Sequence, residues 1–206
     1  MSRTVGRLWV VALAAAAAAY GAEPAAPPRV SFETALGSFA VELEPARAPR
    51  TVANFLRYVD EGRYTEGGRF YRVVRDDNQP DSPVKIAVVQ GGIGFDPPSP
   101  LELPPIAHES TAETGLRHLD GTISMARNEP GSASSEIFVC VGDQPELDFG
   151  GRRNPDGQGF AAFGRVVAGM EVVRAIHRLA AEGQLLVEAV LFSAARAPAG
   201  AASARE

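Results

Sequence analysis

Three short apolar segments carry polar side chains whose types could do chemistry without forming a covalent bond. Arg72 lies within Arg69-Phe-Tyr-Arg-Val-Val-Arg75, Gln90 lies within Ala87-Val-Val-Gln-Gly-Gly92, and a third segment follows at 135–141. All three are β-prone, and a strand gives no structural reason for its arginine or glutamine. These two side chains offer hydrogen bonds and a fixed positive charge. We therefore expect a reaction that needs neither a metal nor a nucleophile.

The sequence gives little support for a metal site, a nucleotide-binding motif or a nucleophilic catalyst. His108, His118 and His177 share no spacing typical of metal ligands, and we expect each to lie on the surface or on a helix face. No Gly-x-Ser-x-Gly, Walker or Rossmann pattern occurs. The single cysteine, Cys140, lies in an apolar run, where a small buried hydrophobe and a reactive thiol are the two interpretations. We expect no metal and no cofactor.

Composition limits the class of protein. The 206 residues are 45% hydrophobic and carry a net charge of −5, which suits one domain with a sizeable core. No basic patch stands out, so we do not expect nucleic acid as a partner. The 16 prolines and 21 glycines indicate many turns, as in an all-β fold. No long apolar surface stretch demands a partner, and we expect a monomer.

The first 22 residues differ in kind from the rest. Arg3 and Arg7 precede an alanine-rich apolar run, Leu8 to Ala19, and small residues follow it up to residue 22. This order is typical of a secretory signal peptide at 1–22, and the run is shorter than the roughly 20 residues of a membrane span. An uncleaved anchor and a buried helix are the alternatives. A signal peptide predicts a periplasmic or secreted protein without stable membrane insertion after cleavage.

Hydrophobic spacing predicts the elements that must position the polar residues. We expect a flexible lead-in at 23–29 and a disordered tail at 194–206. Between them the pattern predicts helices at 51–59 and 170–180. The eight predicted strands cover 30–34, 38–43, 69–75, 86–90, 122–126, 137–141, 161–167 and 185–192. Because no strand–helix–strand spacing repeats, a closed or nearly closed antiparallel barrel fits this inventory, although periodicity alone does not show that the barrel closes.

Seven segments, taken in order, resemble the motifs of the cyclophilins, a family of peptidyl-prolyl cis-trans isomerases, in its bacterial exported form. They are Pro49-Arg-Thr-Val-Ala-Asn-Phe55, Arg69-Phe-Tyr-Arg-Val-Val, Gln90-Gly-Gly, Gly121-Thr-Ile-Ser-Met-Ala126, Ser135-Glu-Ile-Phe138, Leu147-Asp148 and Phe163-Gly-Arg-Val166. Any one of them is weak evidence, whereas the ordered set is strong. The resemblance implies that residues 30–193 form a mainly β, closed eight-stranded antiparallel barrel with two capping helices and a substrate groove on its outer face.

The resemblance also implies roles for individual residues. Arg72 would be catalytic, donating a hydrogen bond to the nitrogen of an Xaa-Pro bond and so weakening the resonance that resists rotation. Gln90 would hold Arg72 and the substrate backbone. The expected substrate-binding positions are Val88, Phe138 and Leu147 around the proline ring, the backbone at Ala126 and Arg127, and the side chains of Glu136 and Phe160. The expected partners are proline-containing peptides and unfolded or exported proteins.

Four positions depart from the family's usual residues, and they leave other hypotheses open. Glu136 replaces a glutamine, Glu146 and Ala87 replace aromatic residues, and Phe160 replaces a histidine or tyrosine. Glu136 could lie close enough to Arg72 to pair with it. One alternative is a catalytically weak, cyclophilin-like module that binds peptides as a chaperone or assembly factor. Another is an unrelated secreted β-barrel binding protein. Taken alone, Arg72 could also be a solvated strand arginine.

Overall fold

The computed structural model describes residues 26–94 and 99–197, so the signal peptide expected at 1–22 lies outside the described residues. The described part contains nine strands and four α-helices. The strands are β1 (Arg29–Thr34), β2 (Gly37–Leu43), β3 (Arg69–Val74), β4 (Val88–Gly92), β5 (Thr122–Met125), β6 (Ile137–Cys140), β7 (Ala161–Ala168), β8 (Ala181–Glu182) and β9 (Leu185–Arg196). The helices are α1 (Pro49–Asp60), α2 (Arg63–Gly67), α3 (Thr111–Thr114) and α4 (Met170–His177).

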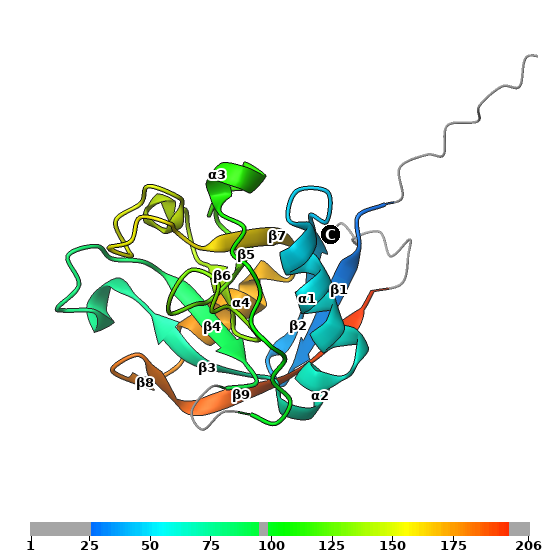
Figure 1. The fold of residues 1–206 in the computed structure, drawn as a ribbon. Coiled ribbons are helices and arrows are strands. Elements are labelled where there is room, and N and C mark those ends of the chain that lie inside the picture. The colour runs from blue at the N-terminus through cyan, green and yellow to red at the C-terminus, as the bar shows by residue number, and fades with distance from the viewer. Residues whose placement is uncertain (1–25, 95–98, 198–206) are drawn as a thin grey trace, which may run out of the picture.

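Eight of the strands close into an antiparallel barrel, which confirms the predicted fold class. They follow the order β1-β2-β7-β5-β6-β4-β3-β9, and β9 pairs with β1 to complete the ring. In Figure 1 the blue first strand and the red end of the last strand lie side by side. Because Val30 pairs with Arg196, residues 194–196 belong to β9 rather than to the expected disordered tail. The two-residue strand β8 is an addition that pairs with β9.

Aromatic rings fill the barrel interior. Phe32 and Phe39 stack with ring centroids 4.7 Å apart, and Phe192 lies 4.6 Å from Phe70 and 5.2 Å from Phe32. All four side chains are buried. Aromatic pairs at these separations add roughly 0.5–1.5 kcal/mol each beyond the burial of their area. Such an interior gives the outer face of the barrel a rigid support.

The two predicted capping helices are present, with slightly different bounds. α1 buries Val52, Phe55 and Val59 and packs against β7 and β9, whereas α4 packs against β2, β3 and β4. Ala48 cannot cap α1 with its side chain, and the buried Glu109 carboxylate accepts the Thr51 N–H at 2.7 Å instead. The sequence did not predict α2 and α3, because five and four residues are too few to show a helical period.

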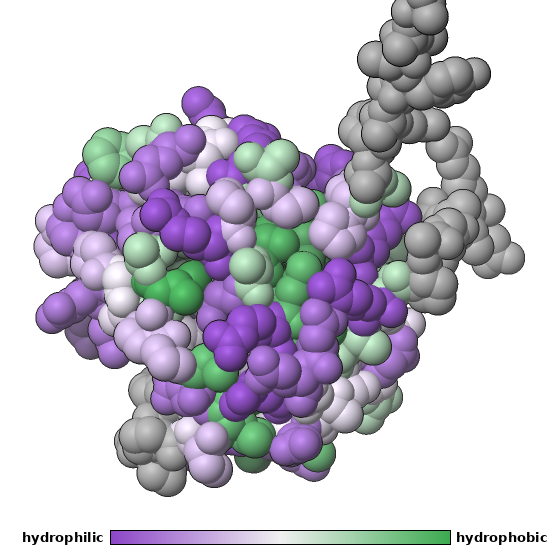
Figure 2. All heavy atoms as spheres, turned by 45° about the vertical axis from the view of Figure 1, so that its right-hand side comes forward, coloured by the Kyte–Doolittle hydropathy of each residue, from purple (hydrophilic) through white to green (hydrophobic). Residues whose placement is uncertain are grey.

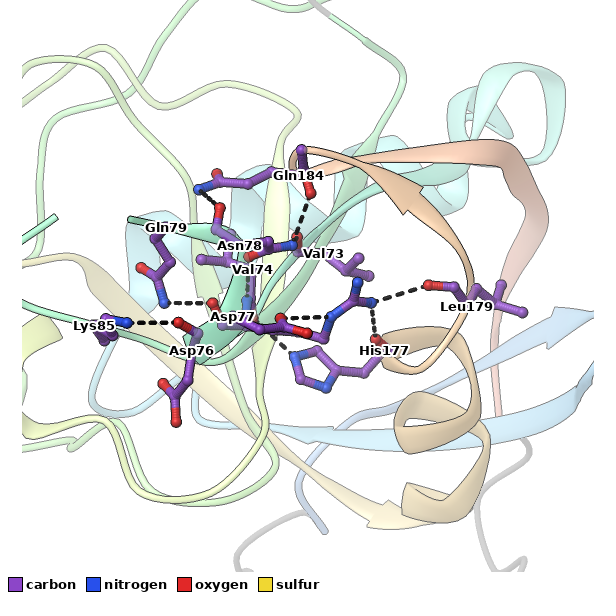
Figure 3. A network of polar contacts seen from close by, with 12 residues as sticks. Val73, Val74, Asp76, Asp77, Asn78, Gln79, Lys85, His177, Leu179 and Gln184 are labelled. Carbon is purple, nitrogen blue, oxygen red and sulfur yellow. Dashed lines mark hydrogen bonds and ion pairs between the residues drawn. The ribbon is translucent and has the colours of Figure 1, made fainter. Parts of the chain in front are cut away.

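A polar network ties the segment after β3 to the turn between β8 and β9 (Figure 3). Its centre is Asn78, whose Oδ1 accepts the Arg75 N–H at 2.7 Å. The Asn78 Nδ2 donates to the Val73 carbonyl at 3.0 Å and to the Gly183 carbonyl at 2.9 Å. The Asn78 carbonyl in turn accepts the Nε2 of Gln184 at 3.2 Å. One asparagine therefore sets the position of the turn that carries Gln184.

We predict that Asn78→Ala lowers the free energy of unfolding by about 2–3 kcal/mol, because three side-chain hydrogen bonds at about 1 kcal/mol each are lost. Urea denaturation measures the change. Asp77→Ala is the matched control, since the Asp77 side chain is 76% exposed and makes one 3.3 Å contact with Arg75. A loss for Asn78→Ala no larger than that for Asp77→Ala would contradict the central place of Asn78 in the network.

Candidate active site

A bulge in β3 places two polar side chains next to each other outside the barrel. The pairings of β3 with β4 and with β9 both shift register between Phe70 and Arg72. Phe70 and Val73 pack in the main core, and Val74 packs in a second, outer cluster. Strict alternation would turn Arg72 inward with Phe70, whereas the extra residue leaves both Tyr71 and Arg72 outside. The bulge is therefore what brings Arg72 to the outer face.

The Arg72 guanidinium lies between two neutral amide oxygens. Its Nη1 donates to the Oε1 of Gln90 at 2.6 Å. Its Nε and Nη2 donate to the Oε1 of Gln184 at 3.0 and 2.5 Å. Gln90 comes from the neighbouring strand β4, and Gln184 comes from the turn between β8 and β9. These acceptors fix the plane of the guanidinium without neutralising its charge.

The side-chain nitrogens of Gln90 and Gln184 are also hydrogen-bonded. The Gln90 Nε2 donates to the Tyr71 hydroxyl at 3.1 Å, and that hydroxyl donates to the Oε2 of Glu136 at 2.6 Å. The Gln184 Nε2 donates to the Asn78 carbonyl. With each amide nitrogen engaged in this way, each amide oxygen faces Arg72. The series from Glu136 through Tyr71, Gln90 and Arg72 to Gln184 is called the arginine chain below.

Glu136 does not pair with Arg72, which corrects the suggestion from its position in the sequence. Its Oε1 accepts the Gly94 N–H at 2.9 Å and the Ser135 hydroxyl at 3.0 Å, while its Oε2 accepts Tyr71. Two residues, Tyr71 and Gln90, therefore separate this carboxylate from the guanidinium along the arginine chain. The carboxylate orients Tyr71 and does not compete directly for Arg72.

Burial and charge set the protonation of the arginine chain. Burial lowers the pKa of Arg72, and repulsion from Arg153 lowers it further, although an arginine keeps its charge near neutral pH. Burial raises the pKa of the Tyr71 hydroxyl, and the negative charge of Glu136 adds to the rise. Tyr71 therefore remains a protonated donor toward Glu136.

Beside the arginine chain, apolar side chains form a cluster outside the barrel. It contains Val74, Ile86, Val88, Phe138, Cys140 and Leu147, with Ala126 and Phe160 packed against it. The Phe138 and Phe160 rings meet edge to face with centroids 5.3 Å apart. Burial raises the pKa of the free Cys140 thiol, so this cysteine is a small buried hydrophobe rather than a reactive group.

The charged and apolar parts meet in one pocket of about 320 Å³. All nine residues proposed from the sequence line it, namely Arg72, Gln90, Val88, Ala126, Arg127, Glu136, Phe138, Leu147 and Phe160. The lining residues that sequence reasoning missed are Ile86, Glu102, Asn128, Ser132, Ser134, Arg153 and Asn154. Ile86 adds apolar surface next to Ala87, where the family's usual aromatic residue is absent. The geometry brings the proposed residues together, and their roles toward a substrate stay predictions.

The guanidinium of Arg127 faces the loop at 148–159. It forms two bonds to the Asp156 carboxylate, at 2.8 and 2.9 Å, and lies 5.2 Å above the centroid of the Phe160 ring. Only 1% of this side chain is exposed. Its charge is therefore neutralised locally, and Arg127 holds the loop and Phe160 against the end of β5.

Behind the pocket, the side chains of Ser124, His118 and Asp148 are hydrogen-bonded in series, as in the Ser-His-Asp triad of hydrolases. His118 Nε2 lies 2.9 Å from the Ser124 hydroxyl, and Nδ1 lies 2.8 Å from Oδ1 of Asp148. Ser124 is fully buried and His118 is 1% exposed, so no substrate can reach the hydroxyl. The imidazole instead stacks on Phe138 with centroids 5.8 Å apart. The expectation that His118 lies on the surface or a helix face is therefore wrong.

The sequence did not identify Tyr71 or Gln184 as members of the arginine chain. Tyr71 is adjacent to Arg72 in the sequence, whereas Gln184 is remote from it. Gln184 follows Gly183 in a tight turn, where a polar residue needs no special explanation. It lies 112 positions from Arg72 in the chain, and only the pairing of β3 with β9 brings the two together. The only hint in the sequence is the closure of the barrel, which places this turn beside the end of β3.

Outside the pocket, exposed apolar side chains include Leu185, Val187 and Leu191 of β9. Figure 2 shows apolar side chains on one face as small patches separated by polar residues. Within residues 26–94 and 99–197, no group of three or more His, Cys, Asp and Glu is arranged to hold a metal ion. Among the helices of that same part, none is long and apolar enough to cross a membrane.

Comparisons with known proteins agree with this geometry. Residues 29–194 match the family described as "Cyclophilin type peptidyl-prolyl cis-trans isomerase/CLD". A peptidyl-prolyl cis-trans isomerase of Streptomyces antibioticus is 41% identical over 150 residues, which cover 71% of this chain and 81% of that protein. Peptidyl-prolyl cis-trans isomerase A of Dickeya dadantii is 38% identical over 154 residues, covering 74% of this chain and 73% of that protein.

Solved structures show the same fold. The crystal structure of a cyclophilin type peptidyl-prolyl cis-trans isomerase of Cryptosporidium parvum gives a TM-score of 0.63 at 17% identity, covering 84% of this chain and 98% of that chain. A second crystal structure of that protein, obtained in the presence of the dipeptide Ala-Pro, gives a TM-score of 0.61 at 18% identity, covering 82% and 99%.

We predict that Tyr71→Phe loosens Arg72, because Gln90 loses the acceptor that orients its amide. The Nε–H signal of Arg72 in ¹⁵N NMR should show faster motion, and the free energy of unfolding should fall by about 1–2 kcal/mol. Tyr64→Phe is the matched control, since it removes a buried hydroxyl that donates to the Ser135 carbonyl outside the arginine chain. If Tyr71→Phe left the Arg72 signal unchanged, the result would contradict the claim that Tyr71 holds Arg72 through Gln90.

Proposed function

The chain belongs to the cyclophilin-type family of peptidyl-prolyl cis-trans isomerases, and we propose that Arg72 is the group with which this isomerase rotates Xaa-Pro bonds. The observation that carries the proposal is the fixed guanidinium that lines the pocket next to its apolar wall. A proline ring would enter the pocket and bring its amide nitrogen to the guanidinium. The reaction is a rotation, so no covalent bond is made or broken.

The chemistry explains why a fixed donor is needed. An Xaa-Pro amide resists rotation with a barrier of roughly 18–20 kcal/mol, because the nitrogen lone pair is conjugated with the carbonyl. Without a catalyst the exchange takes tens to hundreds of seconds. In the twisted state the lone pair leaves conjugation and can accept a hydrogen bond. A guanidinium N–H placed at that nitrogen therefore binds the twisted state better than either planar isomer, which is catalysis by differential binding.

The contacts of Arg72 support this role. A guanidinium has five N–H groups, and the hydrogen bonds to Gln90 and Gln184 use three of them within the described part of the chain. The remaining donors can serve a substrate while the arginine chain holds the group in place. Because Gln184 and Gln90 are neutral, the full positive charge is available to the nitrogen of the twisted amide.

The apolar cluster supports the binding of the proline ring. Val88, Phe138 and Leu147 line the same pocket as Arg72, and Ile86 and Phe160 extend its apolar wall. A proline ring in contact with these side chains would be removed from water, which favours binding by roughly 25 cal/mol per Å² of apolar area. The polar lining residues would then face the backbone of the peptide.

A catalytically weak peptide-binding module is the second candidate function, and one observation favours it. Glu146, at the family's usual aromatic position before Leu147, is turned to Arg152, with 2.7 Å between Oε1 and Nη2. It does not line the pocket, so the apolar wall is smaller there. Such a module would bind proline peptides and unfolded proteins without accelerating their isomerisation.

We also propose that the isomerase acts on unfolded or exported proteins in the periplasm or outside the cell. The support is the order of charged, apolar and small residues in 1–22. On expression in a bacterium, the protein in the periplasmic fraction should have the intact mass of a chain that begins near residue 23. Full-length protein retained in the cytoplasm would contradict the proposal.

We predict that Arg72→Ala lowers kcat/KM for a short Xaa-Pro peptide by about 10²- to 10³-fold, the usual effect of removing one donor to a transition state. Arg72→Lys should lose at least about tenfold, since a single ammonium cannot bridge Gln90 and Gln184. Exchange NMR measures the rates, and the affinity for the peptide should change far less. A folded wild-type chain that binds the peptide without accelerating its isomerisation would favour the second candidate and contradict catalysis by Arg72.

A further inference from the structure

A second guanidinium, that of Arg153, lines the pocket together with Arg72. Its Nη1 donates to the Oε1 of Gln79 at 2.9 Å, to the Ser82 hydroxyl at 2.6 Å and to the Val84 carbonyl at 2.6 Å. These acceptors belong to the segment between β3 and β4, whereas Arg153 belongs to the loop at 148–159. Arg153 is therefore fixed across two loops at the rim of the pocket, and its Nε and Nη2 are not used by these bonds.

Arg72 and Arg153 both lack a carboxylate partner among the ion pairs of residues 26–94 and 99–197. The neighbouring arginines differ, since Arg127 pairs with Asp156 and Arg152 pairs with Glu146. Burial lowers the pKa of Arg153, and burial and then the charge of Arg153 lower the pKa of Arg72. Two half-buried positive charges thus repel each other across one pocket, and an anion between them would relieve that repulsion.

The acids that line the pocket do not supply this anion. Glu136 is held by Tyr71, Gly94 and Ser135, and Glu102 accepts the Ser134 hydroxyl at 2.5 Å. None of these partners belongs to residues 79–84, which hold Arg153. Neither carboxylate pairs with Arg72 or Arg153 within residues 26–94 and 99–197, so both guanidinium charges remain available to an anion from a substrate.

We propose that Arg153 is a specificity-determining residue that makes the pocket prefer proline peptides with a carboxylate side chain directly before or after the proline. This inference rests on the proposed isomerase function. A glutamate or aspartate beside the proline would bring its carboxylate to Arg153 while the proline ring occupies the apolar wall. Arginine suits this task, because its planar fork offers two parallel N–H groups to a carboxylate.

Two pairs of peptides test the proposal by exchange NMR, which needs no coupled protease with a preference of its own. One pair has Glu or Gln directly before the proline, and the other has Glu or Gln directly after it. Wild-type kcat/KM should be about threefold to fivefold higher for the Glu peptide in at least one pair, as expected of a partly exposed ion pair. Salt at 0.5 M should reduce the preference, since screening weakens such pairs.

Variants at neighbouring positions assign the preference to one side chain. Arg153→Gln should bring the Glu-to-Gln ratio close to one, and Arg153→Lys should keep part of the preference. Arg152→Gln is the matched control, because Arg152 is the adjacent arginine of the same loop, is 77% exposed and pairs with Glu146. This variant should keep the wild-type ratio.

Three outcomes would overturn the proposal. One is equal wild-type rates for Glu and Gln in both pairs, and another is the same loss of preference in Arg152→Gln. The third is that Arg153→Gln lowers kcat/KM for the Glu and Gln peptides by the same factor. Arg153 would then only connect the two loops and would not select the substrate. Failure of the isomerase function is distinguishable from all three, because the wild-type chain would then accelerate none of the four peptides.

Discussion

The rest of the site depends on one interaction, in which the charged guanidinium of Arg72 is hydrogen-bonded to two neutral amide oxygens. A carboxylate in the place of Gln184 or Gln90 would fix Arg72 equally well, but it would neutralise the charge that a twisted amide needs. Amide oxygens orient the group and leave its charge intact. The burial of an arginine without a counter-ion is unfavourable, so the surrounding structure must hold the two amides firmly. Tyr71 and Asn78 do this from opposite sides.

The barrel provides the support that such a site needs. Its closed ring of strands and its aromatic interior leave β3, β4 and β6 little freedom, and these strands contribute Arg72, Gln90 and Phe138 to the site. The bulge in β3 is the one local irregularity that the arrangement requires, since it turns Tyr71 and Arg72 to the same side. The loop at 148–159 contributes no residue to the arginine chain, and it brings Arg153 to the pocket.

The nine site residues could be predicted from the resemblance of their segments to the cyclophilin motifs, and all nine line the pocket. Alternation in β4 places Val88 and Gln90 on one face, and alternation in β6 places Phe138 on the same side of the barrel. The bulge could not be predicted, since Arg69-Phe-Tyr-Arg-Val-Val has no glycine or proline to mark it. Gln184 and Arg153 could not be predicted either, because their contacts join segments that are about 70 or more positions apart. Burial of His118 depends on the same kind of distant contact, with Asp148.

The most direct test of the account is a double-mutant cycle between Arg72 and Gln184, with kcat/KM for one Xaa-Pro peptide measured in all four proteins. If Gln184 acts only by holding the guanidinium, Gln184→Ala slows the wild-type chain and causes no further loss when Arg72 is already alanine. Full activity of Gln184→Ala, or a loss that recurs undiminished in the Arg72→Ala background, would contradict the claim that held geometry makes Arg72 the catalyst.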